Sequence, residues 1–137
     1  MNKLPRVSLF VLLLASRQAF AQSANTDFLV QAADGTKLGA TYYSPGTPGA
    51  GILLLHQCNV DRKSWNALGA ALARRGVHVL TFDYRGYGSS PAASSRMNLE
   101  SDIDAALATL VAQPGVDTAR IAAGAPPWMC RPTLRAR

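Results

Sequence analysis

The stretch ILLLHQCNVDRKSWNALGAALARRGVHVLTFDYRGYGSS, residues 52–90, decides the fold of this chain. Its apolar run 52–55 (ILLL) shows no alternation with polar residues, which is typical of a strand covered on both faces, as in a parallel sheet. The run 77–82 (VHVLTF) predicts a second buried strand. The segment 44–51 (SPGTPGAG) is rich in glycine and proline and predicts a loop before the first of them.

A helix is predicted between these two strands, from Trp65 to about Arg75. Ser64 is its expected N-cap, and Gly76 ends it as the first residue past the helix. The buried face is expected to consist of apolar residues at helical spacing, namely Leu68, Ala71 and Leu72.

The flanking sequence extends the pattern. Residues 27–32 and 37–43 are short extended runs joined by a turn that contains Asp34-Gly35, a strong hairpin signal. A helix is predicted over 98–112, and a third core strand over 120–123. The acidic residues of that helix are expected to face out or toward its N-terminus: Glu100, Asp102 and Asp104. A hairpin followed by alternating strands and helices indicates the α/β class with a mostly parallel sheet.

The formal net charge is +6 over 137 residues, but the excess lies at the two ends. Between Gln22 and Gly124 the basic and acidic residues are equal in number, eight of each. A nucleic-acid-binding domain carries a basic face or stripe. The neutral central part therefore argues against nucleic acid as a partner.

Residues 1–21 predict a secretory signal peptide. Lys3 and Arg6 precede the apolar run 7–15, and the small residues at 19 and 21 form an A-x-A cleavage site. The run is too short to cross about 30 Å of hydrocarbon as a helix. We therefore expect cleavage after residue 21, export to the periplasm or medium, and no stable membrane insertion afterwards.

The chain has two cysteines, Cys58 and Cys130. An oxidising compartment would allow them to pair. Their distance in the sequence and unlike surroundings leave unpaired thiols as an equal alternative.

Three segments together resemble the α/β-hydrolase family, nearest to its dienelactone hydrolase-like and esterase-like exported members. LLLHQCNVDRKSW (53–65) resembles the family's His-Gly oxyanion turn, and FDYRGYGSS (82–90) its D-x-R-G-x-G-x-S loop. VDTARIAAG (116–124) resembles the segment that leads into the nucleophile elbow. The resemblance implies that residues 22–124 form the N-terminal portion of an α/β-hydrolase sheet, incomplete as a domain.

Acyl transfer needs a nucleophile, a base and hydrogen-bond donors for the developing oxyanion. The resemblance implies that one donor is a backbone N–H at Gln57 or Cys58, with Cys58 preferred. Gln57 stands where the family usually has glycine, and a side chain there restricts the backbone. The alternative is that 56–58 is a polar loop without this role.

Neither histidine is expected to be the base, because the resemblance places the catalytic histidine beyond residue 137. His56 is expected to stabilise its loop by hydrogen bonds, and His78 to be a satisfied core histidine. Cys58 as a nucleophile would need a nearby histidine base, and its sequence neighbour His56 is expected to point elsewhere.

The loop 83–90 is expected to be structural. Asp83 and Arg85 are predicted to brace it through a salt bridge and backbone hydrogen bonds. Gly86 and Gly88 are predicted to permit its tight turns.

The nucleophile itself is missing from this pattern. The family reads G-x-S-x-G after the third core strand, whereas this chain reads GAPPW over 124–128. In this fold the acid and the histidine follow the serine, so the whole triad is absent from the chain. We interpret 125–137 (APPWMCRPTLRAR) as a basic, proline-rich tail produced by a reading-frame shift, with a native divergent C-terminus as the alternative.

The resemblance implies hydrolysis of a small-molecule carboxylic ester or lactone, without a metal or organic cofactor. Without the triad, this chain is expected to be inactive. A non-catalytic exported fragment or binding module is the alternative function.

Overall fold

The computed structural model describes residues 24–92 and 99–126 of the chain. The predicted leader, Cys130 and most of the predicted tail lie outside these residues. Among the described residues, no helix combines the length and apolar character that crossing a bilayer requires.

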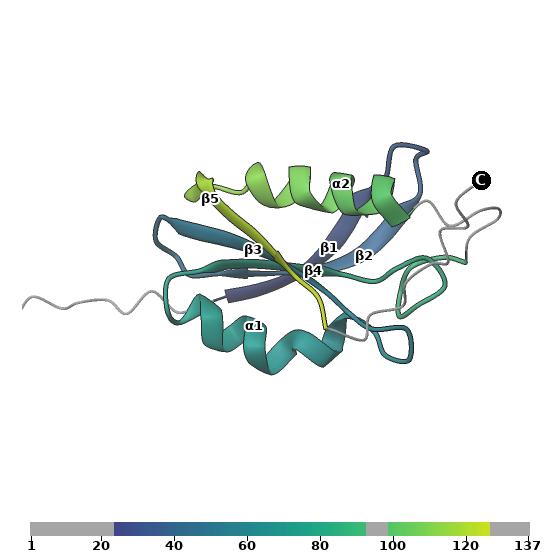
Figure 1. The fold of residues 1–137 in the computed structure, drawn as a ribbon, viewed down its shortest axis with the longest axis horizontal. Helices are drawn as coiled ribbons and strands as arrows, with labels where there is room; N and C mark the ends of the chain where they lie inside the picture. The colour runs from purple at the N-terminus through teal and green to yellow at the C-terminus, as the bar shows by residue number, and fades with distance from the viewer. Residues whose placement is uncertain (1–23, 93–98, 127–137) are drawn as a thin grey trace, which may run out of the picture.

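The described residues form a sheet between two helical layers (Figure 1). The sheet order is β1-β2-β4-β3-β5. Its strands are β1 (Ala24–Gln31), β2 (Lys37–Ser44), β3 (Gly49–Leu55), β4 (His78–Phe82) and β5 (Val116–Gly124). Helix α1 (Asn66–Ala73), preceded by the 3-10 helix η1 (Arg62–Trp65), covers one face, and α2 (Leu99–Val111) covers the other. The predicted α/β class is confirmed.

The predicted hairpin is present as the antiparallel pair β1 and β2. The Asp34 side chain accepts a hydrogen bond of 3.0 Å from the Thr36 N–H. Gly35 has a φ of 82°, a left-handed conformation that glycine adopts without steric cost. The Asp-Gly signal therefore acts through both residues, one by its side chain and one by having none.

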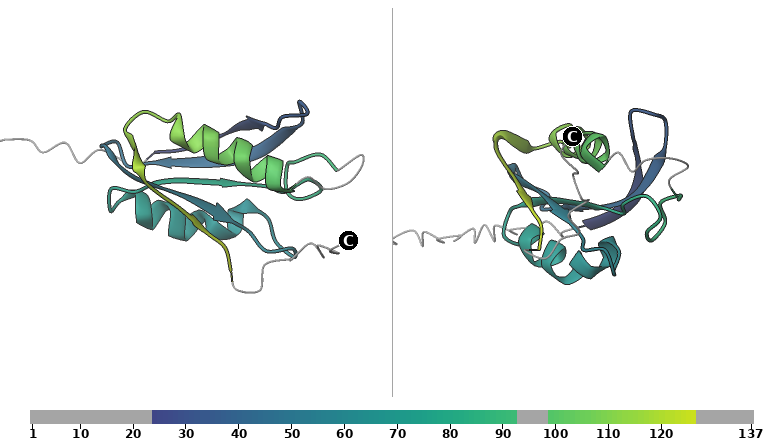
Figure 2. Two further views of the ribbon diagram at one scale, coloured as in Figure 1. Left: turned by 45° about the horizontal axis from the view of Figure 1, so that its top comes forward. Right: turned by 45° about the vertical axis from the view of Figure 1, so that its right-hand side comes forward.

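The parallel strands β4 and β5 are added on opposite sides of β3. Strand β3 pairs in parallel with β4 on one side and with β5 on the other. The connection through α1 leads from β3 to β4, and the connection through α2 crosses back over β3 to β5 (Figure 2). The carboxyl ends of β3 and β5 therefore flank a topological switch point, where open α/β sheets bind their ligands.

Each face of the sheet has its own apolar core. On the α2 side, Leu53, Leu80 and Phe82 pack with Ala106 and Leu110. The α1 side is filled by a smaller cluster, whose buried members are Tyr43, Leu54, Ala73 and Val79. The unbroken apolar sequence of β3 is thus explained by burial on both faces.

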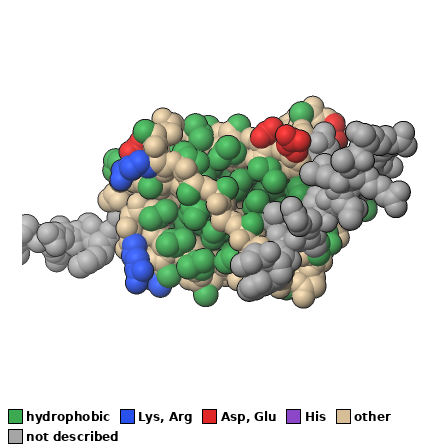
Figure 3. All heavy atoms as spheres, in the orientation of Figure 1, with side chains coloured by type: hydrophobic (Ala, Val, Ile, Leu, Met, Phe, Trp, Pro, Cys, Tyr) green, Lys and Arg blue, Asp and Glu red, His purple; other side chains and the backbone are tan. Residues whose placement is uncertain are grey.

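Strand β5 is the edge of the described sheet next to β3, and all of its residues are exposed or half-buried. By contrast, every residue of β4 is buried. Apolar side chains are spread over the face of the molecule that carries β5 (Figure 3).

Three predicted boundaries are wrong. The strand predicted over 120–123 is longer, from Val116 to Gly124, and none of its residues is buried. Strand β3 begins at Gly49, within the segment predicted as a loop, because Gly49 and Ala50 already pair with the start of β5. Ser64 does not cap α1: the carboxylate of Asp61 caps η1 by accepting from the Lys63 N–H at 2.8 Å, and α1 starts only after Trp65.

The predicted buried face of α1 also needs correction. Leu68 is 42% exposed, whereas Gly69 and Ala73 are buried. A Cβ at Gly69 would lie 2.7 Å from Cε2 of Tyr43. The helix therefore meets the sheet through its smallest residues, since close approach matters more there than side-chain size.

Candidate active site at the carboxyl edge of the sheet

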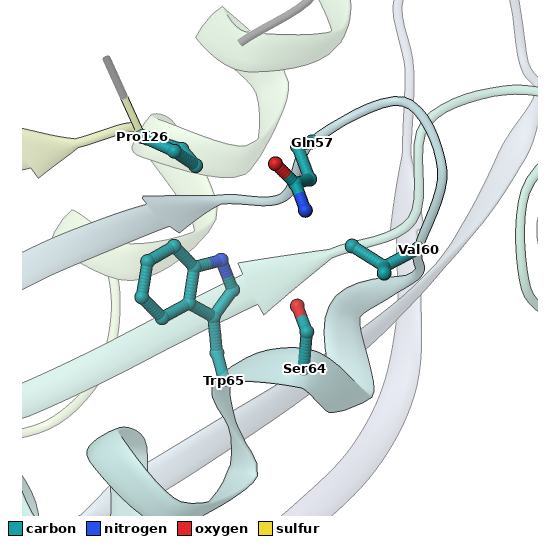
Figure 4. A pocket seen from close by; sticks show the side chains of 5 residues that line it. All are labelled: Gln57, Val60, Ser64, Trp65 and Pro126. Carbon is teal, nitrogen blue, oxygen red and sulfur yellow. The ribbon is translucent and has the colours of Figure 1, made fainter. Parts of the chain in front are cut away.

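A cavity of about 200 Å³ lies at the carboxyl edge of the sheet, lined by Gln57, Val60, Ser64, Trp65 and Pro126 (Figure 4). Gln57 belongs to the loop after β3, and Pro126 follows the end of β5. The cavity therefore sits at the topological switch point between these two strands.

His56 holds the loop after β3 in place. Its ring is fully buried, and Nε2 accepts a 3.0 Å hydrogen bond from the Tyr84 N–H. Because Nε2 accepts, Nδ1 carries the proton and donates to the Gln57 carbonyl at 2.8 Å. Both ring nitrogens are occupied, which confirms the predicted structural role of His56.

Tyr84 packs on the His56 ring with centroids 4.1 Å apart, and Tyr87 lies 5.3 Å from it. Burial raises the pKa of Tyr84 to about 12, so its phenol stays protonated at neutral pH. The loops after β3 and β4 are thus joined through one histidine and two tyrosines.

His78 lies away from this edge and is a satisfied core histidine, as predicted. Its Nε2 donates to the Thr47 carbonyl at 3.1 Å, so its Nδ1 accepts from the Tyr42 hydroxyl at 2.5 Å.

Gln57 forms the oxyanion-type turn without special backbone geometry. No described residue other than glycine has a positive φ, so Gln57 makes the turn in an ordinary conformation. Its carbonyl accepts from His56 and from the Val60 N–H at 3.3 Å, and its side chain lines the cavity. Glycine is therefore not required at this place, and the donor role of Gln57 and Cys58 stays a prediction.

Cys58 is disulfide-bonded, so its sulfur is not a free thiolate nucleophile. It lines a second, shallow hollow of about 350 Å³ between the loops after β3 and β4, together with residues that include Asp61 and Gly86. Only the backbone N–H of Cys58 remains a candidate for the chemistry.

The predicted bracing of the loop by a salt bridge between Asp83 and Arg85 is wrong, because each residue has a different partner. Asp83 is fully buried and pairs with Arg62. Its carboxylate also accepts the backbone N–H of Arg62 at 2.8 Å and that of Ser89 at 2.9 Å. Asp83 thus ties the start of η1 to the loop after β4.

Arg85 points the other way, toward α2 and the hairpin. Its Nε and Nη2 donate to the two carboxylate oxygens of Asp102 at 2.8 and 2.6 Å, and it also pairs with Asp34. Asp102 lies in the first turn of α2 and is buried, so of the two predicted orientations it does not have the outward one. The guanidinium of Arg85 holds the pKa of Asp34 well below its usual value, and Asp102, then Asp34, raise the pKa of Arg85.

The two glycines of the loop permit its turns, as predicted, with φ values of 83° at Gly86 and 48° at Gly88. A Cβ at Gly86 would meet nothing within 4 Å, whereas one at Gly88 would collide with the carboxylate of Asp83. Gly88 is therefore needed both for its conformation and for its lack of a side chain.

No protein-family model matches the chain. Over 101 residues it is 40% identical to the uncharacterized protein Rv2307c of Mycobacterium tuberculosis, an alignment that covers 72% of this chain. The chain spans 36% of the length of that relative.

Solved structures resemble the chain over a larger share of its residues. An acetyl xylan esterase from Paenibacillus sp. R4 matches 80% of this chain and 43% of its own, with a TM-score of 0.67 and 21% identity. The alpha/beta hydrolase GrgF from Penicillium sp. sh18 matches 74% of this chain and 37% of its own, with a TM-score of 0.67 and 17% identity. The chain has the α/β-hydrolase fold. Both comparisons cover only part of that fold, so the described domain is an incomplete one.

Seen as an α/β-hydrolase, the cavity joins two of the sequence landmarks. Gln57 stands in the turn that resembles the oxyanion turn, and Pro126 stands two residues after Gly124, where the G-x-S-x-G pattern has its serine. The structure brings both to the same cavity.

Sequence reasoning missed Arg62, Asp102 and Trp65 as important residues of this edge. The partners of the first two are distant in sequence, and no local pattern marks them. Trp65 was predicted only as the start of a helix. Its place shortly after the oxyanion-type turn was the signal that could have indicated a role at the site.

Proposed function

We propose that this chain is part of a serine-type hydrolase of carboxylic esters or lactones, and that the cavity beside Gln57 is the site of the acyl group. The observation that carries this proposal is the meeting of Gln57 and Pro126 in one cavity at the switch point of the sheet. The likeness to an acetyl xylan esterase and to other esterases supports ester substrates.

The turn after β3 would supply one donor to the tetrahedral intermediate. In this fold the first oxyanion donor is a backbone N–H of that turn, and the second follows the nucleophile. We assign the first to the Cys58 N–H, with Gln57 as the other candidate. A fixed backbone donor acts without reorganising at the moment of reaction, and His56 fixes this turn.

Among the described residues, no set of nucleophile and base lines this cavity. Pro126 has neither a hydroxyl nor an N–H. Ser64 is the one hydroxyl residue among the described residues that line the cavity. It donates to the Asp61 carbonyl at 2.8 Å and has no described histidine as a hydrogen-bond partner. We therefore propose that this chain binds esters without turning them over, which is also what a binding module would do.

The test uses a frame-restored chain. We expect the +1 or −1 reading frame from about codon 123 to encode G-x-S-x-G, with an aspartate and a histidine further on. The chain in that frame should hydrolyse short p-nitrophenyl esters, whereas purified residues 22–137 should not exceed the buffer rate. The absence of any such open frame would contradict the frame shift and favour the binding module.

The donor assignment is tested in the same frame-restored chain. Cys58→Pro removes the backbone N–H and should lower kcat by about 10²–10³-fold. Cys58→Ala keeps the N–H and should retain most of the activity. If Gln57→Pro shows the large loss and Cys58→Pro does not, the donor is Gln57.

We also propose that the chain is exported, because the apolar run 7–15 follows two basic residues and precedes an A-x-A site. Mass spectrometry of the protein outside the inner membrane should show an N-terminus at Gln22. A membrane-bound product that retains Met1 would contradict cleavage.

A further inference from the structure

One wall of the cavity holds a buried hydrogen-bond donor that has no partner among the residues that the structure describes. The indole Nε1 of Trp65 is buried and has no hydrogen-bond partner among the described residues. Buried polar groups of native proteins are nearly always paired, and an unpaired one is costly. The unpaired donor of Trp65 therefore needs an explanation.

The position of the indole is set by apolar packing and not by its N–H. The ring packs against the core cluster on the α1 side, which contains Tyr43, Leu54 and Val79. The backbone that carries it is held by η1, whose cap is Asp61. In Figure 4 the nitrogen edge of the ring lies toward Gln57, on the side of the cavity. The donor is thus held in a fixed direction, beside the cavity, without a partner among the described residues.

The rest of the lining defines what that ligand can be. None of the five residues that line the cavity carries a charge, so a neutral group fits better than an ion. Val60, Pro126 and the indole ring are apolar walls, while Gln57 and Ser64 add polar atoms. A volume of about 200 Å³ lies below the range of roughly 300–1,000 Å³ for pockets that hold drug-sized ligands. The cavity therefore suits a short group.

We propose that the Trp65 indole N–H binds an acceptor oxygen in the acyl part of the substrate. The preferred substrates are then short, uncharged esters whose acyl chain carries a further acceptor oxygen, such as an alkoxyacetyl group. Trp65 is a positioning and specificity residue, since it selects this oxygen and orients the acyl chain beside the turn at Gln57. This inference rests on the proposed function, in which the cavity holds the acyl group.

The experiment measures binding, which needs no turnover. The ¹⁵N-labelled chain has two indole N–H resonances, from Trp65 and Trp128, and Trp128→Phe assigns them. The probes are methyl methoxyacetate and methyl butyrate, which differ by one ether oxygen in place of a methylene. Methyl methoxyacetate should shift the Trp65 resonance downfield in a saturable way and bind roughly five- to tenfold more tightly than methyl butyrate.

The matched variant is Trp65→Phe, which keeps an aromatic wall and removes the donor. It should bind methyl butyrate about as well as the unaltered chain and lose the preference for methyl methoxyacetate. The two probes also make the test on the unaltered chain alone, so the inference does not depend on the folding of the variant. Equal affinities, or a Trp65 resonance that does not move, would overturn the role of Trp65 and leave the acyl site standing. If neither ester binds, both the inference and the acyl site are wrong.

Discussion

Arg62 and Arg85 form two similar clusters on opposite sides of the loop after β4. Each side chain is largely buried, 7% and 8% exposed, and each pairs with one buried and one exposed aspartate. The buried partners are Asp83 and Asp102, and the exposed ones are Asp27 and Asp34. Each guanidinium also donates to a threonine hydroxyl at 3.0 Å.

The two clusters differ in the hydrogen bonds that the buried carboxylate accepts besides those from the arginine. Asp83 also accepts two backbone N–H groups, from the start of η1 and from Ser89. Among the described residues, the Asp102 carboxylate accepts hydrogen bonds from Arg85 alone, and Arg85 keeps Asp34 as a second partner. The Arg62 cluster therefore fixes the two loops beside the cavity, whereas the Arg85 cluster fastens α2 to the hairpin.

Asp83→Asn should have the largest effect on stability. It leaves the buried Arg62 without its main countercharge and turns an amide NH₂ toward donors, which should cost about 3–5 kcal/mol of the free energy of unfolding. Urea unfolding followed by near-ultraviolet circular dichroism measures this. Adding Arg62→Met should recover part of the loss, because the uncompensated cation is gone. A loss below about 1 kcal/mol would remove the distinction between the two clusters.

Gly88→Ala should have the second-largest effect and lower the free energy of unfolding by about 2–4 kcal/mol. It combines a left-handed backbone with a collision against the Asp83 carboxylate. Gly86→Ala is the matched control. Its backbone is also left-handed, with a φ of 83°, but its Cβ meets no atom, and the variant should lower the free energy of unfolding by about 1–2 kcal/mol. Equal losses in the same unfolding assay would mean that the Asp83 carboxylate can move aside freely.

Asp102→Asn should lower the free energy of unfolding by less than Asp83→Asn, about 1–3 kcal/mol, because Arg85 keeps Asp34 and no described backbone donor loses its acceptor. Hydrogen exchange of α2 should rise more than that of η1. A loss equal to that of Asp83→Asn would show that buried charge alone, and not the backbone donors, sets the cost.

Asp34→Asn should have the smallest effect on the free energy of unfolding. The ion pair with Arg85 determines how this effect changes with pH. The pKa of Asp34 is lowered in the folded state, so its contribution is fully present above the usual aspartate value of about 3.9 and declines as the pH falls further. The difference in stability between the unaltered chain and the variant should therefore be larger at pH 7 than at about pH 2.5, and smaller in high salt. A difference that grows on acidification would contradict the pairing with Arg85.

Much of the fold follows from local sequence, because its signals act over a few residues. The turn at Asp34-Gly35, the apolar runs of β3 and β4, and the glycine turns at Gly86 and Gly88 were all predicted correctly. The errors lie at places where a more distant residue or segment determines the local structure. The helical cap is Asp61 and not Ser64, and residues 49–51, predicted as loop, belong to β3 because β5 pairs with them.

The sequence by itself determined the α/β class, the hairpin and the place of the oxyanion-type turn, since periodicity and turn chemistry are written locally. Only the tertiary structure decided which aspartate each arginine meets, that Asp102 is buried, and that the Trp65 donor faces a cavity with Pro126. Arg62 lies 21 residues from Asp83, and Arg85 lies 17 residues from Asp102. Such pairs form because the sheet order brings their loops together, and a charged residue carries no local mark of the partner it will bury.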